Sequence, residues 1–233
     1  MKKTVSMNDV FDEKEEVLYI RPYMFIKGYC IAKDLEQTLI ALAIARKFHN
    51  GQYRKDGKTP YIVHPLKVCT TLIGYGIDDD IILAASLLHD IIEDCSDKLP
   101  LGGRELETEY GLDHEIIDIV KTLSKKSGME QEELAIYFDE IKKNPKALLI
   151  KLSDRLHNSS TLYNFSFPKM REYIEETKNF IIPMASYGKA YYPKYTNALS
   201  ILKNNISSLN TSMEIMLNKF EEYIEESNNQ QGN

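Results

Sequence analysis

The chain has 233 residues, of which 43% are hydrophobic and 27% charged, as in a globular protein with one large domain or two small ones. It has no run of about 18 apolar residues, and its opening, MKKTVSMNDVFDEKEE, lacks an apolar core, which argues against a membrane span and a secretory signal. A net charge of −6 argues against a nucleic-acid polymer as ligand, and three cysteines without metal-type spacing indicate a reducing, cytoplasmic location.

Apolar residues recur at helical spacing along nearly the whole chain, and no alternating pattern indicates a strand. The first helix is expected over 34–50, with Asp34 as its N-cap, and a turn-rich segment follows at 51–60. Further helices are expected at about 65–74, 81–94, 103–110, 113–123, 131–144, 145–162 and 168–191, the last interrupted at Pro183. The pattern predicts an all-α fold.

The C-terminal part has a different rhythm, in which apolar residues are spaced alternately three and four apart. This heptad seam consists of Leu199, Leu202, Ile206, Leu209, Met213, Met216, Phe220 and Tyr223. It could pair between subunits, pack on the N-terminal extension or break into a hairpin, because its middle, NNISSLNTS, is a poor helix former. Packing within the chain is favoured, and the final ESNNQQGN is expected to be a frayed polar tail.

A histidine stands between two prolines in the stretch TPYIVHPLK, at the expected start of a helix. The fixed backbone of Pro60 and Pro65 would hold His64 with little conformational freedom. Just before it, YRKDGK places Arg54 and Lys55 in a glycine-containing segment of an otherwise acidic protein. This local charge suggests a small anionic ligand, although an ordinary solvated loop is favoured when the segment is taken alone.

The stretch IILAASLLHDIIEDC is apolar on nearly every side before its histidine, which predicts a helix buried in the core. Its last two turns nevertheless carry His89, Asp90, Glu93 and Asp94. Burial of a carboxylate is costly unless it is paired or bound to a metal. His89 and Glu93 are four residues apart, and so are Asp90 and Asp94. Each pair would therefore share a helix face, and the four side chains would point at a common space.

A second cluster lies in LLIKLSDRLHN, where a stripe of leucines predicts a buried face. Asp154 and Asn158 are four residues apart and point away from that stripe together, and Lys151 stands one turn earlier. By itself, this cluster could equally be a surface face with ordinary charges.

Two imidazoles and two carboxylates from separate segments form a candidate ligand set: His64, His89, Asp90 and Asp154. Such a mixed set of nitrogen and oxygen atoms suits Mn²⁺, Fe²⁺ or Zn²⁺. Because no thiolate takes part, manganese is the first choice, and another divalent metal is the alternative. His49 is expected to be a structural hydrogen-bonding residue rather than a ligand.

Three motifs in this order, HNGQYRKDGKTPYIVHPLKV, AASLLHDIIEDC and KLSDRLHN, resemble the hydrolase domain of RelA/SpoT-type alarmone enzymes, within the HD superfamily of metal phosphohydrolases. The resemblance implies an all-α fold and Mn²⁺-dependent removal of pyrophosphate from the ribose 3′ position of (p)ppGpp, which yields GDP or GTP. It also implies three parts: an N-terminal extension over 1–33, the HD hydrolase domain over 34–200, and a C-terminal helical extension with a polar tail over 201–233.

Carried over residue by residue, the resemblance assigns the four candidate ligands to the metal. Glu93 and Asp94 match the pair that activates or orients the attacking water. The substrate-binding positions are Arg54, Lys55, Asn158 and Thr161.

Three positions depart from the family pattern. Asp56 stands where serine is frequent, Ser160 where arginine is usual, and Cys95 where threonine is common. An acid beside a polyphosphate is unfavourable, and the missing arginine removes one stabilising contact. The chain is too short to include a synthetase domain, so the resemblance implies a stand-alone small alarmone hydrolase.

Other functions stay open on the sequence. The chain could bind an alarmone without turnover, as a sensor, or hydrolyse another substrate such as ppApp or a 5′-nucleotide. Hydrolases of this size can also serve as antitoxins to a small alarmone synthetase. Beside the nucleotide, the candidate partners are therefore a second copy of the chain and a cognate synthetase.

Overall fold

The computed structural model describes residues 13–126 and 128–231, and the all-α prediction is confirmed, since no strand occurs within these ranges. The chain forms two compact units that divide between Ser124 and Lys125. This division falls inside the predicted domain over 34–200, and the predicted domain limits stay predictions. None of the described helices combines the length and the apolar character needed to cross a bilayer.

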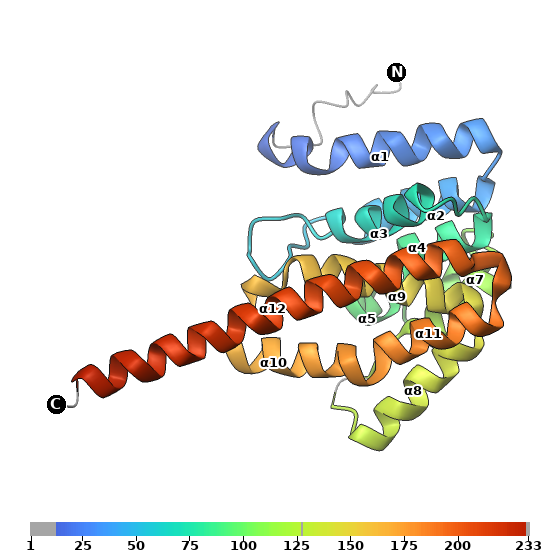
Figure 1. The fold of residues 1–233 in the computed structure, drawn as a ribbon. Helices are drawn as coiled ribbons and strands as arrows, with labels where there is room; N and C mark the ends of the chain where they lie inside the picture. Colours follow the sequence, from blue (N-terminus) through green and yellow to red (C-terminus); the bar gives the residue numbers. More distant parts are fainter. Residues whose placement is uncertain (1–12, 127, 232–233) are drawn as a thin grey trace. The chain divides into compact units, whose positions relative to one another are not determined.

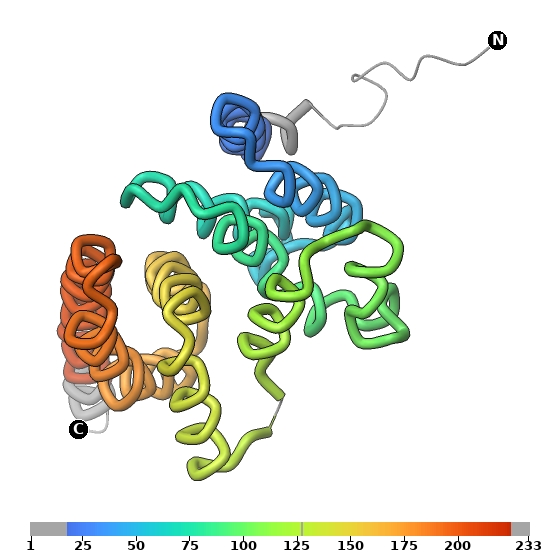
Figure 2. Tube along the Cα trace, turned by 90° about the vertical axis from the view of Figure 1, so that its right-hand side faces the viewer, coloured from blue at the N-terminus to red at the C-terminus, as the bar shows by residue number. Residues whose placement is uncertain are grey.

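The first unit has a core built around one buried helix. Its elements are α1 (Glu13–Lys33), α2 (Glu36–Phe48), α3 (Val63–Gly74), α4 (Asp80–Leu88), α5 (Ile91–Asp94), η2 (Ser96–Lys98), α6 (Arg104–Thr108) and α7 (His114–Leu123). Helix α4 packs against α2, α3 and α7, and α1 lies along α2 and α3 (Figures 1 and 2). Leu83, Leu87 and Leu88 of α4 have no exposed surface, and burial of each contributes about 1.5–3 kcal/mol. This packing fixes the position of the residues that follow α4.

The prediction that Asp34 caps the second helix is wrong. Asp34 has a positive φ of 53° and ends α1 instead. The N–H of Leu35 donates to the Cys30 carbonyl at 3.0 Å, which is the bond that closes helices with a left-handed final residue.

The first turn of α2 is capped by a side chain from another helix. The Asp80 carboxylate accepts from the N–H groups of Gln37 at 2.9 Å and Thr38 at 2.8 Å, and from the Thr38 hydroxyl at 2.6 Å. Because this cap comes from α4, more than 40 residues away in the chain, no local pattern around α2 indicates it.

The single helix expected over 81–94 is interrupted by a turn formed by His89 and Asp90. The Nδ1 atom of His89 lies 2.8 Å from the Ser86 carbonyl oxygen, the acceptor that the Asp90 N–H would use if the helix continued. The prediction of one continuous helix is therefore wrong, and the two residues occupy the turn between α4 and α5. One helical turn still separates Asp90 from Asp94, whose N–H donates to the Asp90 carbonyl at 2.9 Å.

In the second unit, a long C-terminal helix packs along three others. Its elements are α8 (Gln131–Lys143), α9 (Pro145–Ser160), η3 (Leu162–Asn164), α10 (Phe167–Glu176), η4 (Thr177–Ile181), α11 (Ile182–Tyr191), η5 (Pro193–Tyr195) and α12 (Thr196–Gln231). Helix α12 contacts α9, α10 and α11, and its last turns extend past α10 (Figure 1). The segment η4 is a π-helical turn that joins α10 to α11 without a break, and Pro183 is the second residue of α11. A π-helical turn is a frequent way for a helix to accommodate a local irregularity.

The heptad seam of α12 is buried only in its first part. Leu199, Leu202 and Ile206 have no exposed surface, whereas Phe220 and Tyr223 are 49% and 68% exposed. Packing of this helix within the second unit confirms the favoured option, and the unbroken helix excludes the hairpin.

The ends of the chain are described only in part. The backbone of 226–231 is helical, so the predicted frayed tail is wrong for these residues. Residues 1–12, considered above for a secretory signal, and 232–233 lie outside the described residues.

A substitution in α11 tests the packing of the second unit. A Cβ atom at Gly188 would lie 2.5 Å from Leu148 Cδ2 and 3.2 Å from Leu199 Cδ1, both on buried side chains. Overpacking costs about 1–3 kcal/mol, and the gain in helix propensity offsets at most about 1 kcal/mol. We expect Gly188→Ala to lower the free energy of unfolding by about 1 kcal/mol, measured by urea denaturation.

The matched control is Gly28→Ala in α1, where a Cβ atom meets nothing within 4 Å. This variant is expected to be more stable than the parent by about 0.5–1 kcal/mol. A Gly188→Ala protein as stable as the Gly28→Ala protein would contradict the tight packing of α11.

Candidate metal centre

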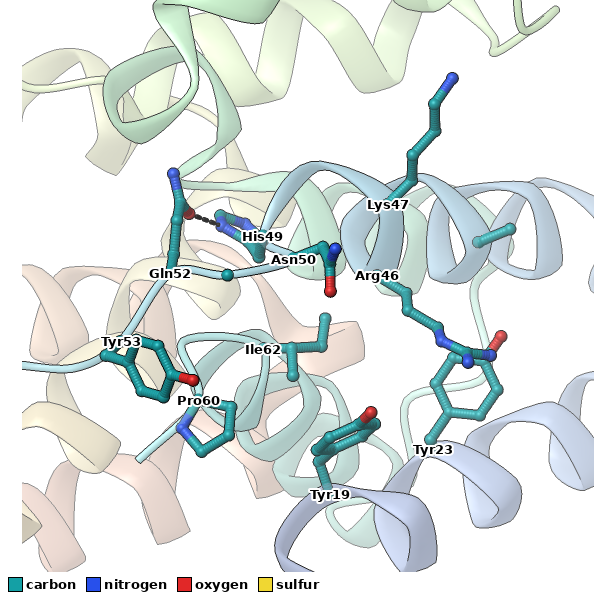
Figure 3. A pocket seen from close by; sticks show the side chains of 12 residues that line it. Tyr19, Tyr23, Arg46, Lys47, His49, Asn50, Gln52, Tyr53, Pro60 and Ile62 are labelled. Atoms are coloured by element: carbon teal, nitrogen blue, oxygen red, sulfur yellow. Dashed lines mark hydrogen bonds between the residues drawn. The ribbon is translucent and has the colours of Figure 1, made fainter. Parts of the chain in front are cut away.

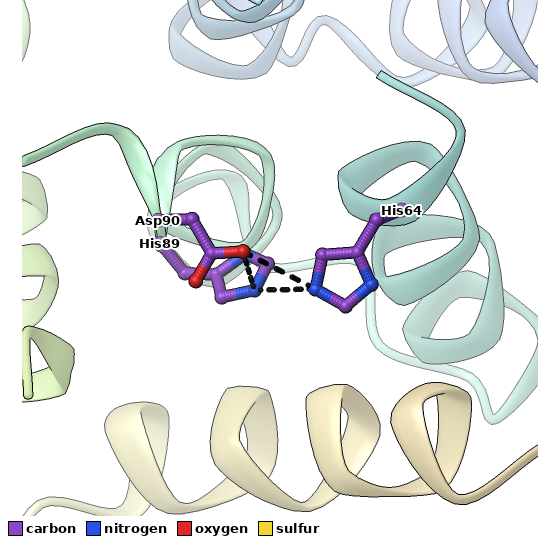
Figure 4. A group of neighbouring side chains, drawn as sticks. All are labelled: His64, His89 and Asp90. Atoms are coloured by element: carbon purple, nitrogen blue, oxygen red, sulfur yellow. Dashed lines mark hydrogen bonds and ion pairs between the residues drawn. The ribbon is translucent and has the colours of Figure 1, made fainter. Parts of the chain in front are cut away.

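Three of the four predicted metal ligands meet in the first unit (Figure 4). His64, in the first turn of α3, points toward His89 and Asp90 in the turn after α4. The Nε2 atom of His64 lies 3.1 Å from His89 Nε2 and 3.3 Å from Asp90 Oδ2, and His89 Nε2 lies 3.2 Å from the same oxygen. The imidazoles of His64 and His89 belong to residues that are 1% and 3% exposed. These three atoms, the His–His–Asp triangle, are held inside the unit.

The His–His–Asp triangle has the dimensions of a metal ligand set. Atoms bound about 2.1 Å from one ion at angles of about 90–110° are about 3.0–3.4 Å apart. The Nδ1 atom of His89 must donate its hydrogen to the Ser86 carbonyl oxygen, which can only accept. The Nε2 atom of this neutral ring therefore carries the lone pair that a metal ion requires. The nitrogen and oxygen donors fit a divalent cation.

Asp90 keeps its negative charge in this position. Burial by itself would raise the pKa of Asp90. When the Nε2 atoms of the two imidazoles carry protons in place of an ion, the charge of His89 and hydrogen bonds from both rings hold this pKa well below its usual range. A bound dication would act in the same direction as these imidazoles.

Tyr61 is a residue of the site that the sequence interpretation missed. Its hydroxyl donates to Asp90 Oδ2 at 2.7 Å. Burial, together with the charges of Asp90 and Asp94, raises the pKa of Tyr61, so the hydroxyl remains a donor. The available signal was its place three residues before His64, inside the same proline-bounded stretch.

The two predicted catalytic carboxylates follow in α5. Asp94 lies close enough to Tyr61 to raise the pKa of the tyrosine hydroxyl through its charge and a hydrogen bond. Gln52 anchors the end of this turn, because its Nε2 donates to the Asp94 carbonyl oxygen at 2.9 Å. Glu93 precedes Asp94, and both residues are exposed, so water and a substrate can reach their carboxylates.

The predicted substrate-binding cations of this unit lie on a short hairpin whose base is an isolated bridge between Tyr53 and Pro60. The guanidinium carbon of Arg54 is 5.5 Å from the ring centre of Tyr61, the residue that bonds Asp90. Lys55 follows and is exposed. Arg54 thus lies beside Tyr61, whose hydroxyl contacts the His–His–Asp triangle.

Asp56, which departs from the family pattern, turns its carboxylate into the hairpin. Its Oδ1 accepts from the N–H groups of Lys58 at 2.9 Å and Thr59 at 2.8 Å, and its Oδ2 accepts from the Thr59 hydroxyl at 2.6 Å. The hydrogen bonds from Thr59 and Lys58 lower the pKa of Asp56 to about 2. The negative charge of Asp56, which the sequence comparison made unfavourable beside a polyphosphate, therefore stabilises the hairpin through hydrogen bonds within it.

The fourth predicted ligand lies in the second unit, on α9. Asp154 is 6% exposed, which argues against an ordinary surface face. Its Oδ1 accepts from Asn158 Nδ2 at 2.5 Å, and its Oδ2 accepts from Lys151 Nζ at 3.2 Å. The Thr161 hydroxyl donates to the Asn158 carbonyl at 3.2 Å. The predicted residues of this unit form one connected group, and its joining to the His–His–Asp triangle stays a prediction.

A buried ion pair that the sequence interpretation missed begins at the next residue along α9. Arg155 is 3% exposed, pairs with Glu176, and donates to the Thr177 hydroxyl at 3.1 Å. Its guanidinium carbon lies 3.9 Å from the ring centre of Tyr173. Burial by itself would raise the pKa of Glu176, but Arg155 and Lys125, which binds the second carboxylate oxygen at 2.8 Å, lower it. The network ties α9 to the π-helical turn.

An all-α fold that gathers two histidines and an aspartate at adjacent helix ends defines a class of helical metal-binding domains. The family comparison identifies the class more closely. The chain belongs to the HD domain family, whose model matches residues 41–186.

The chain is similar to several proteins of alarmone metabolism. It is 36% identical over 148 residues to a guanosine-3′,5′-bis(diphosphate) 3′-pyrophosphohydrolase of Haemophilus influenzae, covering 61% of this chain and 21% of that protein. A protein of the same name from Aquifex aeolicus is 34% identical over 155 residues, which cover 64% and 21%. A GTP pyrophosphokinase of Streptomyces coelicolor is 36% identical over 155 residues, which cover 65% and 18%. The chain spans about a fifth of the length of these relatives.

Proposed function

We propose that this chain is a Mn²⁺-dependent 3′-pyrophosphohydrolase that converts (p)ppGpp to GDP or GTP and pyrophosphate. The observation that carries the proposal is the meeting of His64, His89 and Asp90, with Arg54 beside the tyrosine that bonds this aspartate. Similarity to relatives named for the same reaction supports the substrate class. Manganese is the proposed metal because the donors are nitrogen and oxygen without a thiolate.

The proposed metal ligands are the four that the sequence predicts. His64, His89 and Asp90 would hold the ion together with Asp154. When bound, such a cation neutralises phosphate charge and activates water. Asn158 and Thr161, which are connected to the fourth ligand, would lie beside the ribose.

The remaining chemistry falls to the acidic and basic side chains. Water attacks the phosphorus atom that is bonded to the ribose 3′ oxygen. The bond between this phosphorus and the 3′ oxygen breaks, and pyrophosphate is released. Glu93 or Asp94 takes the proton that the water loses, and the ribose 3′ oxygen gains one. Arg54 and Lys55 bind the polyanion, and the planar guanidinium of Arg54 can also lie against the base.

The proposal is tested by incubating the protein and Mn²⁺ with ppGpp, pppGpp, ppApp and 5′-nucleotides, followed by chromatography of the products. We expect GDP and pyrophosphate from ppGpp. Turnover of 5′-nucleotides alone would show that the chain is a nucleotidase and would contradict the proposal. Binding of ppGpp without any turnover would replace it by an alarmone sensor.

The roles of the two carboxylates of α5 can be separated from binding. We expect the Glu93→Gln, Asp94→Asn double variant to lose about 10²–10⁴-fold in kcat, because no group accepts the proton of water, while KM changes little. Steady-state kinetics with ppGpp measure both quantities. Glu109→Gln, at an exposed position of the same unit, is the control and should match the parent. A double variant with parental kcat would remove these residues from the mechanism.

The location and the partners are also proposals. The cysteines Cys30, Cys69 and Cys95 are free and buried, which agrees with a reducing compartment, and we place the activity in the cytoplasm. A second copy of the chain and a cognate alarmone synthetase stay candidate partners, the latter in an antitoxin role.

A further inference from the structure

We propose that the first unit has a second ligand site, for a nucleoside phosphate, in a pocket formed by α1, α2 and the segment that follows α2 (Figure 3). The pocket has a volume of about 390 Å³. Small-molecule sites in proteins occupy about 300–1,000 Å³, so the pocket is large enough for a mononucleotide.

The lining of the pocket is cationic and aromatic. Arg46 and Lys47 supply positive charge, and none of the 12 lining residues that the structure describes carries a carboxylate, although the whole chain has a net charge of −6. Tyr19, Tyr23 and Tyr53 supply three phenol rings. In Figure 3, Arg46 extends toward Tyr23, and its guanidinium carbon lies 5.4 Å from the centre of that ring. A pocket of this composition favours an anion that also carries a flat ring.

Each part of a nucleotide has a counterpart in the pocket. The guanidinium of Arg46 offers the forked donors that bind phosphate oxygens in pairs. Tyrosine rings provide faces on which a base can stack, and the amide of Asn50 can both donate to and accept from a base edge. Pro60 and Ile62 form an apolar part of the wall.

Simpler ligands use the pocket less completely. An inorganic anion would make no use of the faces of the tyrosine rings, and an uncharged apolar ligand would make no use of the guanidinium donors of Arg46. Lys47 donates to the Tyr110 hydroxyl at 2.8 Å, so it contributes charge to the pocket more than a direct contact.

This pocket is distinct from the site proposed above for the alarmone. The cations of the hairpin, Arg54 and Lys55, are not among its lining residues, and neither is any member of the His–His–Asp triangle. Tyr19 and Tyr23 lie on α1, outside the residues 41–186 that match the HD domain. The N-terminal extension therefore completes a pocket that the matched domain lacks by itself.

The wall of the pocket is shared with the neighbouring site. Tyr53 and Pro60 line the pocket and also form the bridge at the base of the hairpin. His49 lines the pocket as well, and its ring stacks on that of Tyr61 at 4.7 Å between centres. Since Tyr61 bonds Asp90, a ligand in the pocket would press on residues that position both the hairpin and the triangle. This coupling rests on the proposed hydrolase function, whereas binding in the pocket does not.

Binding is tested by isothermal titration of the full chain with GMP, AMP and inorganic phosphate, in EDTA so that no metal contributes. We expect the two mononucleotides to bind and phosphate alone to bind at least about tenfold more weakly, since it lacks the stacked ring. Arg46→Gln should weaken mononucleotide binding at least about tenfold. Arg104→Gln, at an exposed position of the same unit, is the matched control and should bind like the parent.

A second variant keeps the test decisive if Arg46→Gln folds poorly. Ala43 is exposed and lines the pocket, so Ala43→Leu reduces its volume without a change in charge and should also weaken binding. The Arg54→Gln, Lys55→Gln double variant should retain binding. Loss of binding in that double variant, with retention in Arg46→Gln and Ala43→Leu, would place the nucleotide in the alarmone site and overturn the proposal. Equal affinity for phosphate and GMP, or no binding by the parent, would overturn it too.

The coupling has a separate readout. AMP, which is not a product of ppGpp hydrolysis, should change the KM for ppGpp in the parent and have a much smaller effect in Ala43→Leu. If AMP binds but leaves the kinetics of the parent unchanged, the coupling is wrong and the second site stands. If the chain hydrolyses no alarmone, the proposed function fails, and the titration still decides the second site.

Discussion

Asp154→Ala is expected to lower turnover at least about a thousandfold and to abolish the thermal stabilisation that Mn²⁺ gives to the parent. Asp154 is the predicted ligand contributed by the second unit, and its side chain is nearly buried. Without it, the ion would lose one of four ligands and one of two negative charges. Steady-state kinetics give the loss of turnover. The metal content after dialysis, and melting temperatures with and without Mn²⁺, give the loss of binding.

Two further variants show whether the effect is specific. Asp90→Ala removes a member of the His–His–Asp triangle and should reproduce both losses. Asp139→Ala removes a carboxylate of the second unit that pairs with Lys142 and Lys143 on α8, and should keep metal and turnover. If Asp154→Ala retained both while Asp90→Ala lost both, the four-ligand site would be wrong and the first unit alone would bind the ion.

Arg155→Met is expected to lower the free energy of unfolding by about 3–5 kcal/mol, because Glu176, whose side chain is only 14% exposed, would lose its guanidinium partner. Lys125 still binds the other carboxylate oxygen of Glu176, which places the cost toward the lower end of that range. Urea denaturation of the parent and the variant measures the difference. The Arg155–Glu176 pair lies beside a π-helical turn, which Arg155 also contacts through the Thr177 hydroxyl.

Two comparisons separate a buried pair from a general loss of charge. Arg155→Met combined with Glu176→Leu should recover much of the loss, since an apolar pair of similar volume leaves no buried charge uncompensated. Arg171→Met removes one member of the Arg171–Glu221 pair, in which both side chains are about 40% exposed. It should lower the free energy of unfolding by less than about 1 kcal/mol. An Arg155→Met cost as small as that of Arg171→Met would show that the buried pair contributes little.

The sequence predicted the all-α fold and the members of the His–His–Asp triangle. Polar residues inside an apolar helix pattern are costly to bury, so their presence marked His89 and Asp90 as candidates. The expectation of one continuous helix over 81–94 was wrong, because α4 ends at Leu88 and α5 begins at Ile91. The triangle forms all the same, since packing of α3 against α4 brings His64 to this turn.

The features that the sequence interpretation missed are those made by distant parts of the chain. Asp80 caps α2 from another helix, and Arg155 pairs with Glu176 across two helices. The phenol of Tyr61 reaches Asp90, which lies 29 residues further along the chain. Helical periodicity and local capping rules describe neighbours within a few residues, so they carry no information on contacts of this kind.

The closed hairpin between Tyr53 and Pro60 has a consequence for affinity. Asp56 and Gly57, the latter with a φ of 66°, hold its tip in one conformation through bonds internal to the loop. Ordering a flexible backbone costs about 1–2 kcal/mol per residue, and a loop that is ordered before the encounter avoids most of that entropic loss. Arg54 would then meet a polyanion as part of a preorganised surface. Less of its electrostatic attraction would be offset by the entropic cost of ordering the loop, and the affinity would be higher.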